Sequence, residues 1–231
     1  MRYAADHKQA TRRRIVEAAA AVFKRRGQAA AGVDEVMREA GLTAGGFYAH
    51  FPSKDALFAE AIGESLQATS VVSGRTAEAG LGAEHLRAMA AKYLSGAHCR
   101  TIEKGCPMPP LLADLARASP NARVAFAKLV RERLDELMPH FRDAGVTWRD
   151  APWAMLALFV GGVALARAMP DEAAAERIVV ACRRMFDDVL RSSSVSSRRS
   201  RAKPPALTPQ KKSRKPKSRR SDTLSARRST P

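Results

Sequence analysis

Hydrophobic residues recur every three or four positions along residues 1–190. Runs with this spacing begin at Ile15, Leu57, Leu86, Ala127 and Ile178, and each run forms a stripe that one face of a helix can bury. The strict alternation expected of half-buried strands is not found in this part of the sequence. The pattern therefore predicts an all-α fold.

Residues that favour helix ends divide this region into separate helices. Gly27 ends the first apolar stripe, and Ser53 is placed to cap the helix that carries Leu57. Ser119-Pro120 is a capping residue followed by a first-turn proline, and Gly145 marks the end of the helix that follows. Glycines between residues 74 and 82 predict a loop.

Two further helices are predicted at residues 151–169 and 171–190. The stretch Ala151–Ala166 carries no charged residue, is short for a membrane span and has Pro152 in its first turn. We therefore interpret it as a helix buried in the core or in a dimer interface, where small residues four positions apart would let another helix approach closely. The residues predicted for a dimer interface are Ala157, Gly161, Gly162, Ile178, Met185 and Phe186.

Residues 32–51 have the pattern of two short helices joined by a tight turn. The first helix has an apolar face, and Gly41 supplies the left-handed residue that ends it. Thr43 is placed to cap the second helix. Phe47 and Phe51, four positions apart, lie on one face of the second helix and are predicted core residues.

The rest of the second helix is predicted to be exposed. Tyr48 and His50 point away from the core face, and the small residues at 44–46 let the backbone approach another surface. Such a helix fits the major groove of DNA, and the following helix start, Ser53-Lys54, offers free amides and an amine to a phosphate. The alternative is a helical hairpin that only packs against its neighbours.

Together these residues form a long, ordered motif across residues 12–62. Its members are Arg14-Ile15, Ala18-Ala19, Phe23 to Gly27, Val36, Ala40-Gly41, Thr43, Gly45, Phe47 to Phe51, Ser53-Lys54 and Leu57. This motif resembles the DNA-binding domain of TetR/AcrR-family transcriptional regulators.

The resemblance implies a function as well as a fold. It implies a homodimer whose recognition helices, residues 44–50, enter successive major grooves of a palindromic operator, and a helical C-terminal half that dimerises and binds a small ligand. The groove contacts that it implies come from Thr43, Ala44, Gly45, Gly46 and Tyr48, and the phosphate contacts from His50 and Lys54.

Three features near this motif affect the expected contacts with DNA. Residues 28–32 contain no hydroxyl, although family members usually place a threonine or serine ahead of the second helix, so a cap and its phosphate contact are expected to be missing. Asp34 and Glu35 are expected to serve the helix dipole. Arg12–Arg14 either reach phosphates or form a solvated face.

Charge is concentrated at the C-terminal end of the chain. The 231 residues include 40 Lys or Arg and 23 Asp or Glu, a net charge of +17, yet residues 1–66 carry only +2. Residues 191–231, here called the basic tail, contribute +13. Their Ser, Pro, Lys and Arg composition predicts a disordered segment, which is either merely solvated or binds phosphates non-specifically.

Composition also excludes several classes of protein. The first residues carry no apolar stretch of a secretory signal, and three cysteines fit a reducing cytoplasm better than a disulfide framework. His98, Cys99 and Cys106 lack zinc-finger spacing, so neither a metal nor another cofactor is expected. Nor does the sequence contain a catalytic triad, a paired-carboxylate motif, a Walker loop or a dinucleotide fingerprint, which argues against an enzyme.

The C-terminal half contains two further candidate features. Residues 103–118 resemble a Gly-Cys-(Pro/Leu) segment of one branch of the family, and Arg100 and Lys104 are expected to lower the pKa of Cys106. Cys106 is then either a reactive sensor or a packing residue. The residues that could line an apolar ligand cavity, or be plain core, are Met89, Tyr93, Cys106, Phe126, Trp148, Trp153 and Met155.

These predictions combine into one organisation with two functional hypotheses. Residues 1–66 form a DNA-binding domain, residues 67–190 a ligand-binding and dimerisation domain, and residues 191–231 the basic tail. The first hypothesis is a dimeric repressor released from its operator by a small molecule or a reactive electrophile. The second is an architectural DNA-binding protein dominated by the basic tail. If the first hypothesis holds, a chain ending at Leu190 keeps its preference for the operator.

Overall fold

The computed structural model describes residues 2–69 and 82–201, and every regular element in these ranges is helical. The all-α prediction is therefore confirmed. The elements are α1 (Arg2–Ala30), α2 (Val33–Glu39), the 3₁₀ helix η1 (Ala44–Ala49), α3 (Lys54–Ala68), α4 (Ala83–Tyr93), α5 (Gly96–Arg100), α6 (Met108–Arg117), α7 (Pro120–Asp143), α8 (Ala151–Ala168) and α9 (Glu172–Arg201).

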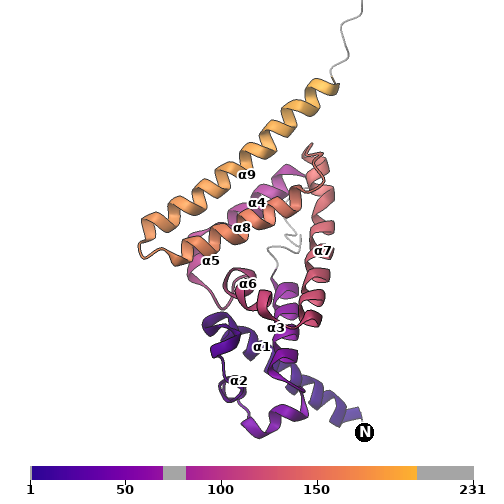
Figure 1. The fold of residues 1–231 in the computed structure, drawn as a ribbon. Coiled ribbons are helices and arrows are strands. Elements are labelled where there is room, and N and C mark those ends of the chain that lie inside the picture. The colour runs from indigo at the N-terminus through magenta and orange to yellow at the C-terminus, as the bar shows by residue number, and fades with distance from the viewer. Residues whose placement is uncertain (1, 70–81, 202–231) are drawn as a thin grey trace, which may run out of the picture.

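The helices form two bodies, one above the other in Figure 1. The lower body contains α1, α2, η1 and α3, and the upper body contains α4 to α9. Helices α8 and α9 run side by side as a hairpin, and α7 stands along the opposite edge. Both α1 and α3 contact the upper body, through α6 and α7 respectively, so the lower body is packed directly against the upper one.

Aromatic side chains fill the centre of each body. In the lower one, the rings of Phe23 and Phe58 meet edge to face with centroids 5.3 Å apart. In the upper one, Phe159 joins α8 to Tyr93 at 5.5 Å and to Phe186 of α9 at 5.1 Å. Burial of this apolar surface is the main force that orders the helices.

The predicted helix ends have the expected capping geometry. The Ser53 hydroxyl accepts a hydrogen bond from the amide of Ala56 at 3.1 Å, and Ser119 accepts one from Ala122 at 3.3 Å. Gly27 interrupts α1 with φ 78° and ψ 161°, a conformation that disfavours side chains. These three end signals are confirmed.

The C-terminal boundary differs from the prediction. Helix α9 continues to Arg201, past Leu190, where the helical domain was expected to end. Extending an existing helix fixes one residue for each hydrogen bond gained, so a polar sequence can prolong a helix that it could not nucleate. The remainder of the basic tail, and residues 70–81 of the predicted loop, lie outside the described residues.

The uncharged stretch of residues 151–166 forms most of α8. Among the described helices, α8 alone has the length and hydropathy to cross a membrane, judged by length and composition only. One face of α8 is buried against its neighbours, and Phe159 and Val163 are almost inaccessible. The opposite face exposes Trp153 and Leu165, so α8 is a core helix with one open side.

A stacked histidine pair joins α4 to α7 and gives the fold a pH dependence. The rings of His85 and His140 are 4.0 Å apart and nearly parallel, at 12°. Burial and the neighbouring His85 lower the pKa of His140 below its usual 6.5. As pH falls through this value, the unfolded chain binds a proton before the folded one does, so stability is lost towards acid pH.

We therefore expect His140→Gln to flatten the decline of the unfolding midpoint between about pH 7 and pH 5. Urea unfolding at a series of pH values measures this. The control is His7→Gln, because His7 is exposed on α1 and should leave the profile unchanged. Equal profiles for the wild type and His140→Gln would contradict the prediction.

Candidate functional site

Helices α2 and η1 form the predicted helix-turn-helix. Val36 and Met37 bury the inner face of α2. The turn begins at Gly41, whose φ of 69° falls in the left-handed region as predicted. The amide of Leu42 then donates to the carbonyl of Met37 at 2.8 Å, which closes the end of the helix.

The second helix of the motif is a short 3₁₀ helix with one buried and one open side. Phe47 is fully buried and stacks on Phe51 with ring centroids 5.9 Å apart, so the predicted core face is confirmed. Tyr48 projects on the other side and is 76% exposed. A Cβ atom added to Gly45 would meet no heavy atom within 4 Å, so the surface beside Tyr48 is free of overhanging side chains.

Thr43 holds the N-cap position of η1 with extended backbone angles, but its hydroxyl makes no capping hydrogen bond. The first turn closes instead through the backbone, where the Gly46 amide donates to the Thr43 carbonyl at 3.2 Å. Thr43, Ala44 and Gly45 are all exposed. The motif thus presents a hydroxyl, a phenol and bare backbone on one surface.

The two predicted phosphate contacts fit less well. The Lys54 ammonium donates to the carbonyls of Ala29 and Ala31, at 3.3 and 3.2 Å, which ties α3 to the end of α1. Nδ1 of His50 is buried without a hydrogen-bond partner, and burial with the nearby Lys8 and Arg12 lowers the pKa of this histidine. His50 is therefore held neutral at pH 7 and offers no cation to a phosphate.

The N-terminus of α2 agrees with the expectation of a missing cap. Gly32 holds the cap position and supplies no side-chain hydrogen bond. Asp34 and Glu35 lie in the first turn, where their charges suit the helix dipole. Glu35 is also paired with Arg26 at 3.4 Å, which turns that carboxylate towards α1.

The three consecutive arginines of α1 do not form one surface. Arg13 is exposed and pairs with Glu17 of its own helix at 3.2 Å. Arg12 and Arg14 instead donate to backbone carbonyls of the helix-turn-helix, at His50 and Ala40 respectively. Arg12 is half-buried, whereas Arg14 keeps an exposed side chain, so the solvated-face alternative fits Arg14 better than Arg12.

The predicted ligand-binding residues do not line a common cavity. Met89, Tyr93, Cys106 and Met155 are buried in the core. Phe126 is partly buried against the core, while Trp148 and Trp153 are 54% and 46% exposed. Met89, Tyr93, Cys106 and Met155 are therefore packed as core, which was the alternative interpretation, whereas both tryptophans lie at the surface.

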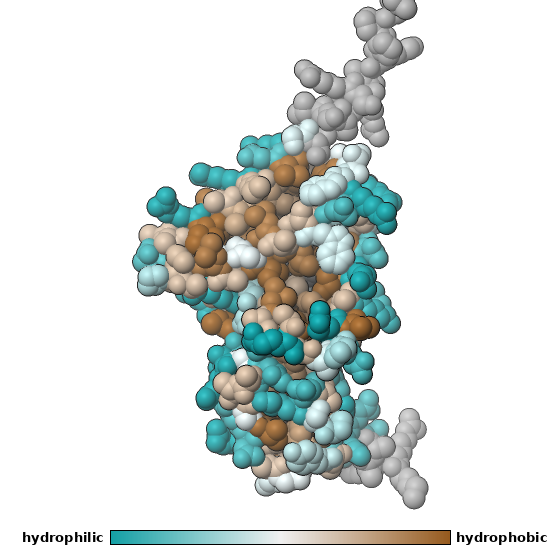
Figure 2. All heavy atoms as spheres, viewed as in Figure 1, coloured by the Kyte–Doolittle hydropathy of each residue, from teal (hydrophilic) through white to brown (hydrophobic). Residues whose placement is uncertain are grey.

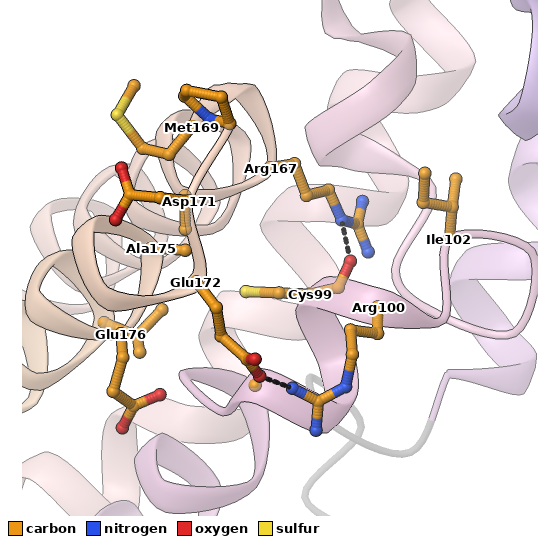
Figure 3. A pocket seen from close by; sticks show the side chains of 13 residues that line it. Cys99, Arg100, Ile102, Arg167, Met169, Asp171, Glu172, Ala175 and Glu176 are labelled. Atoms are coloured by element: carbon orange, nitrogen blue, oxygen red, sulfur yellow. Dashed lines mark hydrogen bonds and ion pairs between the residues drawn. The ribbon is translucent and has the colours of Figure 1, made fainter.

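An open cleft of about 420 Å³ lies elsewhere in the upper body, between α5, the end of α8 and the start of α9. Figure 3 shows Cys99 directed across it towards α9 and Arg100 paired with Glu172, with a nitrogen–oxygen distance of 2.6 Å. Met169, Ile102 and other apolar residues share the lining with these charges. The sequence analysis considered Cys99 and Arg100 for other roles, so no sequence signal pointed to this cleft.

Cys106 has surroundings opposite to those expected of a reactive thiol. It is fully buried, and that burial raises its pKa despite the nearby cations of Arg167 and Lys24. The cations that act on the sulfur are Arg167 and Lys24, not the expected Arg100 and Lys104. The prediction of a lowered pKa is therefore wrong, because the segment that carries Cys106 folds into the core.

A hydrogen-bonded network connects the cleft with the lower body. Arg167 donates to the carbonyls of Cys99 and His98, at 3.2 and 2.9 Å. His98 Nε2 accepts from the Cys106 amide at 3.0 Å. The buried ammonium of Lys24, on α1, donates to the carbonyl of Gly105 at 3.4 Å and to Ser65 of α3 at 3.2 Å.

The residues predicted for a dimer interface divide into two groups. Gly162 and Phe186 face inward, since a Cβ atom on Gly162 would lie 2.8 Å from Cys182 Sγ and Phe186 is only 4% exposed. Ile178 is partly buried against the core. Ala157, Gly161 and Met185 lie on the open side of α8 and α9, and Figure 2 shows apolar surface over these helices.

Within the described ranges, no group of three or more His, Cys, Asp or Glu side chains is placed to hold a metal ion. The chemistry of the lower body is that of hydrogen bonding and close backbone approach. The arrangement suits contact with a polyanion groove better than acid–base or nucleophilic catalysis.

Comparison with known protein families agrees with this geometry. Residues 15–61 match the family described as bacterial regulatory proteins, tetR family. This span contains α2, η1 and most of α3 together with half of α1. No curated protein sequence matches the chain.

Solved structures share the fold over most of the chain. A TetR-family transcriptional regulator from Cytophaga hutchinsonii aligns with a TM-score of 0.64 and 18% identity, covering 80% of this chain and 96% of its own. One from Agrobacterium tumefaciens gives 0.60 and 19%, covering 77% and 98%. The reduced form of E. coli NemR gives 0.57 and 19%, covering 74% and 94%. At these identities the likeness establishes a common fold.

Proposed function

This chain belongs to the tetR family of bacterial transcriptional regulators, and we propose that it is a cytoplasmic repressor that binds a palindromic operator as a homodimer and is released by a small molecule. The family regulates transcription by binding DNA and is not a family of enzymes. The proposal is that the protein represses transcription, that its DNA site is palindromic and that its signal is a small molecule.

The observation that carries the DNA-binding role is the open surface of η1. Tyr48 is 76% exposed, Thr43 and Ala44 are exposed, and a Cβ atom on Gly45 would meet no heavy atom within 4 Å. A protein backbone can approach base edges and phosphates closely only where such space exists. We assign groove contacts to Thr43, Ala44, Gly45, Gly46 and Tyr48. Lys54 and His50 are secondary candidates, because reaching a phosphate would require them to leave their present positions.

The dimer is proposed to form through the open side of α8 and α9. Leu165 is 54% exposed and Met185 is 62% exposed, which is unusual for large apolar residues in a monomer. Gly161 has no heavy atom within 4 Å of its Cβ position, so a partner helix could pack against the backbone there. A two-fold dimer places two reading helices on successive major grooves, which is the geometry that a palindromic operator needs.

The small molecule is proposed to bind in the cleft between α5, α8 and α9. Its lining combines apolar side chains with a few polar groups, as ligand sites usually do. Arg167 belongs both to the cleft and to the network that reaches Lys24 on α1. A ligand that favoured one position of this network would shift the population towards a dimer with the wrong operator spacing.

A reactive electrophile is the less favoured signal. Cys106 is buried and its raised pKa disfavours the nucleophilic thiolate. Attack on this sulfur would first require the segment around Gly105 to open.

Selection of bound DNA from a random pool, using the purified full chain, tests the proposal most directly. The expected result is an inverted repeat whose half-site centres lie about one helical turn, or a multiple of it, apart. Recovery of sequences without an inverted repeat would overturn the proposal that a homodimer binds a palindromic operator.

Tyr48→Phe is expected to weaken operator binding by about 1 to 1.5 kcal/mol, the worth of one hydrogen bond to a phosphate. The phenol is exposed, so its removal should not change folding. Titration of the selected operator measures the loss. Trp148→Phe, another exposed aromatic far from η1, is the matched control; an unchanged affinity for Tyr48→Phe would remove the hydroxyl from the interface.

A further inference from the structure

The short 3₁₀ helix η1 depends on its neighbours for its position. It has six residues and lacks a side-chain cap at Thr43. Such a segment is unstable by itself, because 3₁₀ hydrogen bonds are poorly aligned and the first turn is costly to form. Phe47 within η1 and Phe51 just beyond it are buried in the core, but the first residues of η1, Ala44 and Gly45, are exposed and gain no such packing.

Arg14 contacts the end of α2, where the turn into η1 begins. Its guanidinium Nη2 donates to the carbonyl of Ala40 at 2.6 Å. Ala40 is the C-cap residue of α2, and carbonyls at this end of a helix have no partner within the helix. Gly41 leaves room for the contact, since a Cβ atom there would lie 3.1 Å from the same nitrogen.

Arg12 contacts the C-terminal end of η1. Its Nη1 donates to the carbonyl of His50, the C-cap residue of η1. The guanidinium also lies 4.0 Å from the centre of the Phe51 ring and donates through Nε to Glu60 of α3 at 3.0 Å. Contacts with His50, Phe51 and Glu60 fix the orientation of this arginine, and its Nε, Nη1 and Nη2 atoms each already donate to a protein acceptor.

We propose that Arg12 and Arg14 are positioning residues for DNA reading, which tie the C-terminal end of the recognition helix and the turn before it to α1. They act through the carbonyls of His50 and Ala40 and do not contact DNA. Residues two apart on a helix point to different sides, so the long side chains of Arg12 and Arg14 reach separate parts of the helix-turn-helix, while Arg13 between them pairs with Glu17. The proposal rests on DNA reading by η1, but the clamp itself can be tested without DNA.

Hydrogen–deuterium exchange of the DNA-free protein gives the first test. The amides of Gly46, His50 and Phe51 are hydrogen-bonded within η1 or its ends. Arg12→Met and Arg14→Met keep the aliphatic stem and remove the donors, and we expect exchange at these amides to be about tenfold faster. Arg13→Met, which removes the same charge from the next position, should exchange like the wild type.

DNA binding gives the second test, on the selected operator and on a non-cognate duplex. Arg14→Met should lower operator affinity about tenfold, while its non-cognate affinity and its salt slope match those of Arg13→Met. A direct phosphate contact would instead weaken both duplexes alike and reduce the salt slope by about 0.9, relative to Arg13→Met.

Unchanged exchange in both Arg12→Met and Arg14→Met would overturn the clamp. If Arg12→Met fails to fold, Arg14→Met decides alone, because Arg14 is exposed and its substitution removes the hydrogen bond to the Ala40 carbonyl without opening the core. Failure to recover any operator would count against the repressor proposal, while faster exchange would still support the clamp.

Discussion

Replacing Gly105 with alanine is expected to lower the free energy of unfolding by about 2 to 3 kcal/mol, a large effect for one methyl group. A Cβ atom at this position would lie 2.8 Å from both Cδ2 and Nε2 of His98 and 3.0 Å from Nη2 of Arg167. Contacts this short cannot be tolerated, so either the ring, the guanidinium or the loop must move.

The neighbours of Gly105 have little freedom to move. Nε2 of His98 accepts from the Cys106 amide, and Nδ1 is 2.7 Å from the Tyr93 carbonyl, so both ring nitrogens are fixed. Burial lowers the pKa of His98, which favours the neutral ring with its proton on Nδ1. Moving the loop instead would break the bond between Lys24 and the Gly105 carbonyl and leave a buried ammonium less satisfied.

Urea unfolding of Gly105→Ala and Gly63→Ala makes a matched comparison. Gly63 is helical, in α3, and a Cβ atom there would meet only Leu129 Cδ1 at 3.4 Å, an ordinary contact, so alanine should raise stability by about 0.5 to 1 kcal/mol. A stability loss at Gly105 below about 0.5 kcal/mol would show that the loop is not held by His98 and Arg167.

The sequence predicted the helices well wherever one physical signal acted alone. The period of the apolar stripes placed α3, α4 and α7, and the hydroxyls of Ser53 and Ser119 marked helix starts because they replace a missing backbone acceptor. The end of α9 was missed, because the Ser and Arg residues after Leu190 carry no stop signal and their composition resembles that of disordered segments.

The functional site was predictable only in part. Tyr48 could be placed on the surface because Phe47 and Phe51 fix which side of η1 is buried. The partners of Arg12 and Lys54 could not be predicted. A long cationic side chain can reach either a phosphate or a nearby carbonyl, and the sequence does not distinguish the two. Only the packing of α1 against α3 decides between these targets.

The cleft between α5, α8 and α9 could not be predicted for a related reason. A buried aromatic ring and a ligand-contacting ring have the same periodicity along a helix, so Tyr93 gave no sign of its place in the core. The cleft is formed where α5 meets the junction of α8 and α9, by residues distant in sequence such as Arg100 and Glu172. Such a meeting point follows from tertiary packing and leaves no local pattern.

Removing residues 202–231 is expected to change the salt dependence of DNA binding more than any point substitution. These residues carry ten Lys or Arg and one Asp. If about five of the cations neutralise phosphates, the slope of log K against log salt becomes shallower by about 4 to 5 when they are removed. Between about 50 and 200 mM salt, the full chain would then lose about 10² to 10³ times more affinity than the shortened one.

Ending the chain at Arg201, not at Leu190, keeps the whole of α9 in the comparison. The matched control is a full-length chain with the same ten cations replaced by glutamine, which separates charge from length. Both variants should keep the ratio of operator to non-cognate affinity, because the residues proposed to read bases lie in η1 and residues 1–66 carry a net charge of only +2. If the operator preference disappears with the cations, an architectural protein that coats DNA through its basic tail becomes the better account.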